Sequence, residues 1–115
     1  MTNSLDLPTA IAIAANSKTD SETVILEVGE VLAITGWFVV TSGANSRQVR
    51  AITEEIERSL DEAGGPKPQR IEGLDDCKWV LMDYGDVIVH IFDNDTRDFY
   101  DLERLWRDVP RVEWS

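Results

Sequence analysis

The chain has 115 residues, of which 43% are hydrophobic and 29% are charged, and this composition predicts one soluble domain over residues 1–115. Its 22 acidic residues against 11 basic ones give a net charge of −11. Such a charge disfavours direct binding to nucleic-acid phosphates, since that binding requires clustered lysine and arginine. No apolar run approaches the roughly 20 residues of a membrane span. Cys77 is the single cysteine, which excludes an intramolecular disulfide and a thiolate metal cage and agrees with a cytoplasmic location.

The first half of the chain predicts a helix and then two strands. Residues 1–17 form an Ala-rich and Ile-rich segment, in which Asp6 is expected to cap a helix and Pro8 is tolerated in the first turn. Residues 23–28 and residues 37–41 are rich in β-branched and aromatic side chains. Both runs have the length of a strand, so two strands are expected there.

The strongest helical pattern of the chain follows Ser42-Gly43. Asn45 and Gln48, three residues apart, form a capping box at the start of this helix, and Gly64-Gly65-Pro66 ends it. One apolar stripe at helical spacing is predicted to face the core. Its members are Val49, Ile52, Ile56, Leu60 and Ala63.

Two arginines in the first turn of this helix require a partner. Arg47 and Arg50 meet the positive end of the helix dipole, at a cost of about 0.3 to 1 kcal/mol each. Arg50 is expected to pair with Glu54 at i,i+4. Arg47 is expected to reach an acid elsewhere in the domain or on a partner.

A β-hairpin is predicted in the last third of the chain. Val80–Met82 and Val87–Phe92 are apolar runs of strand length. Gly85 lies in the turn between them and can adopt the positive φ of a tight turn. Both alternate sets of the second run are largely apolar, so an interior strand covered on both faces is expected. The turn and its acids are expected to stay in water.

A last helix is predicted to begin near Asn94 or Asp95 and to end before Pro110. A short strand over residues 68–73 precedes the hairpin. The inward-facing residues of the last helix are predicted to be Phe99, Leu102, Leu105 and Trp106.

The order α-β-β-α-β-β-β-α predicts an α/β fold, a single domain with a mixed β-sheet of about five strands flanked by helices. The long helix connects the strand over residues 37–41 with the strand over residues 68–73. These two strands therefore form a candidate parallel pair with a right-handed crossover.

Two long motifs stand in this order along the chain. The first is FVV followed by SG over residues 38–43, with RQVRAI over residues 47–52. The second is WVLMDYGDVIVHIF over residues 79–92, with FYDLERLW over residues 99–106. Together they resemble the Iojap family, the ribosomal silencing factors, and the resemblance extends from the first strand to Val112. Departures from the family pattern occur at Gly29 and at Gly36-Trp37.

The resemblance implies a nucleotidyltransferase-like fold in a protein that is not an enzyme and needs no cofactor or metal. It implies binding to the large ribosomal subunit through its fourteenth protein, a basic protein on the intersubunit face. The bound domain would sterically block subunit joining and so repress translation. A homodimer off the ribosome is expected through the same free hairpin face.

The partner-binding residues are carried over from the second motif. A large aromatic residue beside an acid is typical of an interface hot spot that faces a basic surface. Residues 76–115 also carry ten acids against five bases, which indicates a basic protein partner, although these charges can serve solubility alone. Whether the tryptophan is exposed or belongs to the core stays open at this point. The predicted contact residues are Trp79, Leu81, Asp83, Tyr84 and Asp86.

A nucleotide-binding enzyme related to the nucleotidyltransferases is the alternative. Ser42-Gly43 leads from a strand into a helix N-terminus, where backbone N–H groups can hold a phosphate. Asp93-Asn94-Asp95 is the one D-x-D run that could bind Mg²⁺. This run follows the last strand rather than the strand expected beside Ser42-Gly43, and Asp95 is expected to cap a helix. His90, the single histidine, is interpreted as a structural residue bonded to a neighbour rather than as a base or a ligand.

Overall fold

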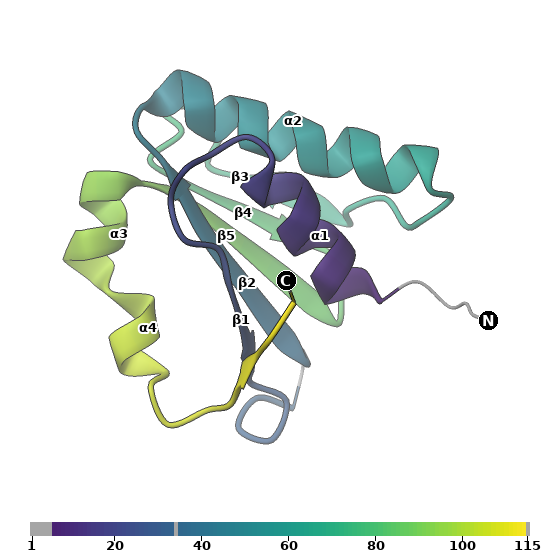
Figure 1. Ribbon diagram of the computed structural model, residues 1–115, viewed down its shortest axis with the longest axis vertical. Helices are drawn as coiled ribbons and strands as arrows, with labels where there is room; N and C mark the ends of the chain where they lie inside the picture. Colours follow the sequence, from purple (N-terminus) through teal and green to yellow (C-terminus); the bar gives the residue numbers. More distant parts are fainter. Residues whose placement is uncertain (1–5, 34, 115) are drawn as a thin grey trace.

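The computed structural model describes residues 6–33 and 35–114 (Figure 1). Residues 1–5 of the predicted N-terminal helical segment lie outside this part. The sheet contains six strands in the order β3-β4-β5-β2-β1-β6. The elements are α1 (Leu7–Asn16), β1 (Val24–Glu27), β2 (Trp37–Gly43), α2 (Ser46–Glu62), β3 (Arg70–Glu72), β4 (Trp79–Asp83), β5 (Val87–Asp93), α3 (Asn94–Tyr100), α4 (Leu102–Leu105) and β6 (Arg111–Val112).

The predicted hairpin and the interior position of its second strand are confirmed. β4 and β5 pair antiparallel, and Gly85 in their turn has φ 87°. β5 lies between β4 and β2, and it runs parallel to β2. β5 holds this central position because both of its faces carry apolar side chains.

The predicted parallel pair of β2 and β3 is wrong, since β4 and β5 lie between these strands. β3 forms one edge of the sheet, where a strand with a single apolar residue, Ile71, loses little by having one neighbour. The sheet also has one strand more than predicted. β6 pairs with β1 at the opposite edge, and its two residues after Pro110 are too few to give a strand pattern in the sequence.

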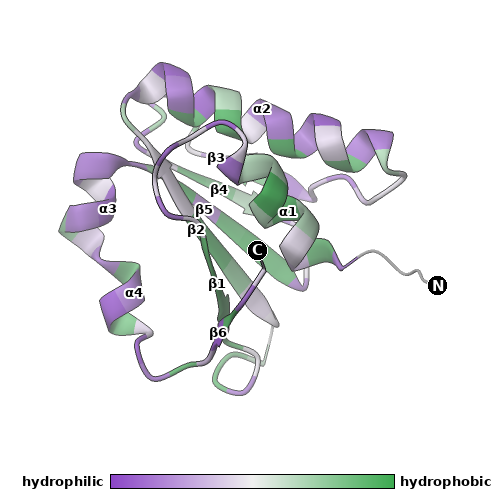
Figure 2. Ribbon diagram, viewed as in Figure 1, coloured by the Kyte–Doolittle hydropathy of each residue, from purple (hydrophilic) through white to green (hydrophobic). Residues whose placement is uncertain are grey.

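Helices α1 and α2 pack on one face of the sheet (Figures 1 and 2). Both predicted N-caps are confirmed, because Asp6 accepts from the backbone N–H of Thr9 and Asn45 accepts from that of Gln48 at 2.9 Å. The apolar stripe of α2 is buried as predicted, except that Ala63 is exposed at the C-cap. The first hydrophobic core lies between this face and the two helices: Ile11, Ala12, Ala14, Ala15, Ile25, Val39, Val49, Ile52, Ile56, Leu60, Cys77, Val80, Met82, Tyr84, Val87, Val89 and Ile91.

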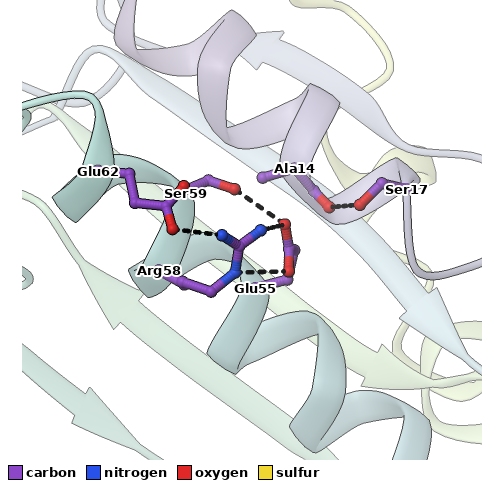
Figure 3. A network of polar contacts seen from close by, with 6 residues as sticks. All are labelled: Ala14, Ser17, Glu55, Arg58, Ser59 and Glu62. Atoms are coloured by element: carbon purple, nitrogen blue, oxygen red, sulfur yellow. Dashed lines mark hydrogen bonds and ion pairs between the residues drawn. The ribbon is translucent and has the colours of Figure 1, made fainter.

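The outer face of α2 is polar, and its ion pairs are local. Arg58 reaches Glu55 and Glu62, and Ser59 donates to Glu55 close to the C-terminal end of α1 (Figure 3). Arg58 and Glu62 are exposed, and an exposed ion pair contributes little to stability. The expected ion pair between Arg50 and Glu54 is wrong, because Arg50 Nη2 donates instead to the Leu74 carbonyl at 2.8 Å.

The opposite face of the sheet is covered by α3 and α4. The last helix begins at Asn94 as predicted, but its N-cap is Asp93 rather than Asp95, with Asp93 Oδ1 accepting from Thr96 N at 2.8 Å. Asp101 then adopts a left-handed conformation with φ 49° and ends α3. The second hydrophobic core lies here: Val24, Leu26, Val28, Phe38, Val40 and Phe92, with Leu102 and Trp106 packed against them.

The break at Asp101 changes which side chains face the sheet. Leu102 and Trp106 point inward as predicted. The prediction is wrong for Phe99 and Leu105, which are 80% and 73% exposed. The left-handed residue shifts the phase of α4 relative to α3, so Phe99 no longer shares a stripe with Leu102 and Trp106. Leu105 lies at the C-terminal end of α4, off the side that carries Leu102 and Trp106.

Candidate partner-binding surface

The helices leave one part of the sheet uncovered. α3 and α4 pack over β1, β2 and β5, and on β4 α3 reaches only Trp79 at the end of the strand. Among the described helices, none packs on β3 or on the rest of β4 on this face. Leu81 on β4 is half-buried and belongs to neither hydrophobic core. We call this surface the open face. Its residues are Arg70, Glu72, Trp79, Leu81, Asp83 and Ile88, which share one side of three neighbouring strands.

Trp79 joins the open face to the second core. Its ring packs on Phe92 at a centroid distance of 4.9 Å and on Tyr100 at 4.7 Å. Its indole Nε1 donates to His90 Nδ1 at 3.1 Å. The side chain is half-buried, so Trp79 is neither a core residue nor a free anchor. One side of the indole is held by the fold, and the remainder is available to a partner.

His90 is a structural residue with a defined hydrogen bond. It is 6% exposed, and its ring lies edge-on to Phe38 at 4.6 Å. Burial lowers the pKa of His90 to about 4, so the imidazole is neutral near pH 7. Because Nδ1 accepts from Trp79, the proton lies on Nε2. Within residues 6–33 and 35–114, this Nε2 has no hydrogen-bond partner. The prediction that His90 bonds to a neighbour is confirmed.

The hairpin turn is less exposed than expected. Asp83 accepts from Gly85 N at 2.8 Å, and its Oδ2 lies 3.6 Å from Arg70 Nε on the open face. Tyr84 is 7% exposed and turns to the first core, on the opposite side of the sheet. Burial raises the pKa of its hydroxyl well above the ordinary value. The prediction that the turn stays in water is therefore wrong for Tyr84, and of the four turn residues only Asp86 is exposed.

Three of the five predicted contact residues thus share one surface. Trp79, Leu81 and Asp83 lie on the open face. Tyr84 lies beneath the other face, and Asp86 lies at the tip of the turn, at the far end of the hairpin from Trp79. Their contact role stays a prediction.

The sequence prediction missed a hollow at the other end of the hairpin. Its volume is about 550 Å³, and Phe99 and Tyr100 of α3 form one wall beside Trp79. The signal is present in the sequence as two adjacent aromatic residues in an acidic helix, but Phe99 is predicted to face inward and no role is predicted for Tyr100. We call this site the aromatic hollow, and its lining residues are Asp76, Lys78, Trp79, Asp95, Thr96, Phe99 and Tyr100.

The loop proposed for a nucleotide is filled by the chain itself. Ala44 N donates to Gln48 Oε1 at 2.6 Å, and Gln48 Nε2 donates to the Lys18 carbonyl. A Cβ at Gly43 would lie 3.0 Å from the Gln48 side chain. The hydroxyl of Ser42 accepts from Arg97 Nη1 at 2.9 Å. These side chains occupy the helix N-terminus where a phosphate would need free N–H groups.

The placement of the D-x-D run differs from expectation. Asp93 lies directly beside Gly43 because β5 neighbours β2, so the view that another strand flanks this loop is wrong. Asp93 nevertheless serves as the cap of α3, and Asn94 accepts from Ser21 Oγ. In the part of the chain that the structure describes, no three His, Cys, Asp or Glu side chains gather as metal ligands. None of its described helices combines the length and apolarity of a membrane span.

Residues 2–115 match the family model described as ribosomal silencing factor during starvation. The chain belongs to this family. The ribosomal silencing factor RsfS of Bacillus subtilis is 37% identical over 102 residues, which cover 89% of this chain and 86% of that protein. A crystal structure of a Bacillus halodurans protein superposes with a TM-score of 0.78 at 35% identity, covering 94% of this chain and 97% of that one. Mouse mitochondrial assembly of ribosomal large subunit protein 1 is 27% identical over 84 residues, which cover 71% of this chain and 37% of that protein.

Membership of the silencing factor family confirms the resemblance and the α/β fold. The bacterial relative is named for a regulatory role, which agrees with a protein that is not an enzyme. The open face and the aromatic hollow both include residues of the second motif. Trp79 and Leu81 come from its first half, and Phe99 and Tyr100 come from its second half.

Proposed function

We propose that the chain binds the fourteenth protein of the large ribosomal subunit, in the cytoplasm, and prevents joining of the small subunit. The observation that carries this proposal is the open face, an uncovered strand surface with Trp79, Leu81 and Asp83 side by side in a ribosomal silencing factor. A half-buried tryptophan and a leucine supply apolar contact area, and the acid supplies complementarity to a basic protein.

The charge of the chain favours a protein contact over an RNA contact. A net charge of −11 repels the phosphates of exposed ribosomal RNA. The same charge attracts a basic protein and accelerates the encounter with it. The chain is therefore suited to a basic protein that lies among RNA on the subunit surface.

The proposed inhibition is steric and requires no chemistry. The domain measures 39 × 33 × 26 Å along its principal axes. A body of this size held on the intersubunit face occupies space that the small subunit needs. Translation is then repressed because joined ribosomes do not form.

Reassociation of purified subunits tests the proposal. We expect the chain to sediment with large subunits and to lower the yield of joined ribosomes. A Leu81→Lys variant should lose both effects, because a cation then faces a basic partner. The control variant Ile13→Lys also replaces an aliphatic residue by lysine, at an exposed position of α1. It should sediment with large subunits and lower the yield of joined ribosomes as much as the unchanged chain does. Normal joining at saturating protein would contradict the proposal.

The nucleotide-binding alternative has less support, since the chain's own side chains occupy the N-terminus of α2. Titration with ATP and Mg²⁺ by calorimetry tests it directly. We expect no heat of binding. We also expect a second copy to compete for the open face off the ribosome, so a homodimer should dissociate when the basic ribosomal protein is added.

A further inference from the structure

Two aromatic residues that line the aromatic hollow lie outside both hydrophobic cores. Phe99 is 80% exposed and Tyr100 is 50% exposed, and α3 contains no buried residue. Neither ring belongs to a hydrophobic core. Exposed aromatic rings that stabilise no core are typical of a binding surface.

The rings are arranged to present their faces. Trp79 and Tyr100 lie 4.7 Å apart at an angle of 49°, while Tyr100 and Phe99 lie 5.0 Å apart at 88°. In the nearly perpendicular contact between Phe99 and Tyr100, the edge of one ring meets the face of the other. The ring that makes contact through its edge therefore keeps its faces free of the other ring. The volume of about 550 Å³ lies within the range of small-molecule sites and accommodates one long side chain.

The charge of the hollow favours a cation. Two acids, Asp76 and Asp95, line it against one base, Lys78. Asp98 and Asp101 flank the two aromatic residues in the sequence and are also exposed. An aromatic face beside carboxylates is the combination that binds guanidinium and ammonium groups.

The hollow is continuous with the open face, because Trp79 belongs to both. We propose that the aromatic hollow receives one arginine side chain of the basic ribosomal protein that covers the open face. Arginine fits better than lysine, since its planar guanidinium stacks on a ring while its N–H groups pair with a carboxylate such as Asp95. This inference rests on the proposed function, whose partner it shares.

Two substitutions test the walls separately through binding to purified large subunits. Phe99→Leu keeps an apolar side chain and removes the ring, and we expect about a fivefold rise in Kd. Phe99→Trp should restore binding. Asp95→Asn removes one charge and should weaken binding by a similar factor. The matched controls are Leu105→Ala and Asp108→Asn, which change exposed residues of the same chemistry outside the hollow and should leave the Kd unchanged.

A second measurement needs no ribosome. The indole N–H resonance of Trp79 is followed by NMR while N-acetylarginine methylamide is added, and then with the lysine analogue. We expect a saturable shift with the arginine probe, a weaker one with the lysine probe, and none in Phe99→Leu. Equal shifts for the two probes would overturn the choice of arginine.

The two experiments separate the hollow from the proposed function. Unchanged binding of both Phe99→Leu and Asp95→Asn to large subunits would overturn the hollow and leave the proposed function intact. Failure of the unchanged chain to bind large subunits would remove the proposed function, together with the partner named for the hollow. The arginine titration would then still show whether the hollow binds a cation.

Discussion

The indole Nε1 of Trp79 donates a hydrogen bond to Nδ1 of His90, 3.1 Å away on the neighbouring strand. This bond holds the tryptophan at the border between the second core and the open face. The acceptor exists only while His90 Nδ1 is unprotonated, so the position of a surface residue depends on the protonation of a buried one.

The first prediction concerns stability at low pH. Burial lowers the folded-state pKa of His90 to about 4 from an ordinary value of 6.5. Between these values the unfolded chain binds the proton more readily, so this residue makes stability fall as pH decreases from about 6.5 to about 4. The contribution of His90 to the slope of the free energy of unfolding against pH is on the order of 1.4 kcal/mol per pH unit. Urea unfolding at several pH values should show a shallower decrease for His90→Phe, and parallel pH curves would contradict the prediction.

The second prediction separates binding from folding on the open face. Leu81 belongs to neither core, so Leu81→Ser should change the melting temperature little while weakening large-subunit binding by about 2 kcal/mol. Trp79→Ala should lower both binding and stability, because the indole also packs on Phe92 and Tyr100. Calorimetric melting and sedimentation binding measure the two effects. A loss of stability in Leu81→Ser equal to that in Trp79→Ala would assign Leu81 to the core.

The third prediction concerns the acids of the hairpin. Replacing Asp83 and Asp86 together by Asn keeps side-chain size and turn preference. The association rate with the isolated ribosomal protein should fall, and its dependence on salt should flatten, because opposite charges are screened over about 8 Å at physiological ionic strength. A double variant of Glu54 and Glu57 to Gln removes two exposed charges from α2 and serves as the control. Identical salt slopes for all three proteins would show that the hairpin acids do not steer the encounter.

The fourth prediction concerns the attachment of α3. Arg97 donates from Nε to Glu103 at 2.8 Å and from Nη1 to Ser42 and to the Glu22 carbonyl. Its side chain is largely buried, so Arg97→Met removes the donor to Ser42 and to the Glu22 carbonyl and leaves Glu103 only its longer contact with Arg111 at 3.9 Å. We expect a loss of about 3 kcal/mol in the free energy of unfolding. Arg104→Met, at an exposed position of α4, should stay within about 0.5 kcal/mol in the same urea titration.

Local signals in the sequence predicted local structure well. The N-caps Asp6 and Asn45 and the positive φ of Gly85 were all found, because each depends on residues a few positions apart. The pairing of β2 with β5 depends on which strands are most apolar on both faces, and the connecting helix misled the prediction toward β3. The break at Asp101 could not be read from helical periodicity, because a left-handed aspartate leaves no pattern of its own.

The open face was predicted in part, because the alternation of side chains along a strand is also a local signal. Alternation along one strand placed Trp79, Leu81 and Asp83 together. Alternation could not show that Tyr84 turns to the opposite side of the sheet, because a turn residue does not follow the alternation of side chains along a strand. The exposure of Phe99 followed from the same break at Asp101, so one local irregularity concealed the aromatic hollow.

The central parallel pair also sets when this chain can fold during its own synthesis. Trp37 pairs with Val87, and Gly43 pairs with Asp93, so each contact spans about half of the polypeptide. Until β5 has left the ribosomal exit tunnel, β2 exposes an apolar edge and the first core lacks its middle strand. Contacts of such long sequence separation slow folding. The nascent chain therefore depends on the completed second half of its sequence, and a product truncated before residue 87 should be insoluble rather than partly active.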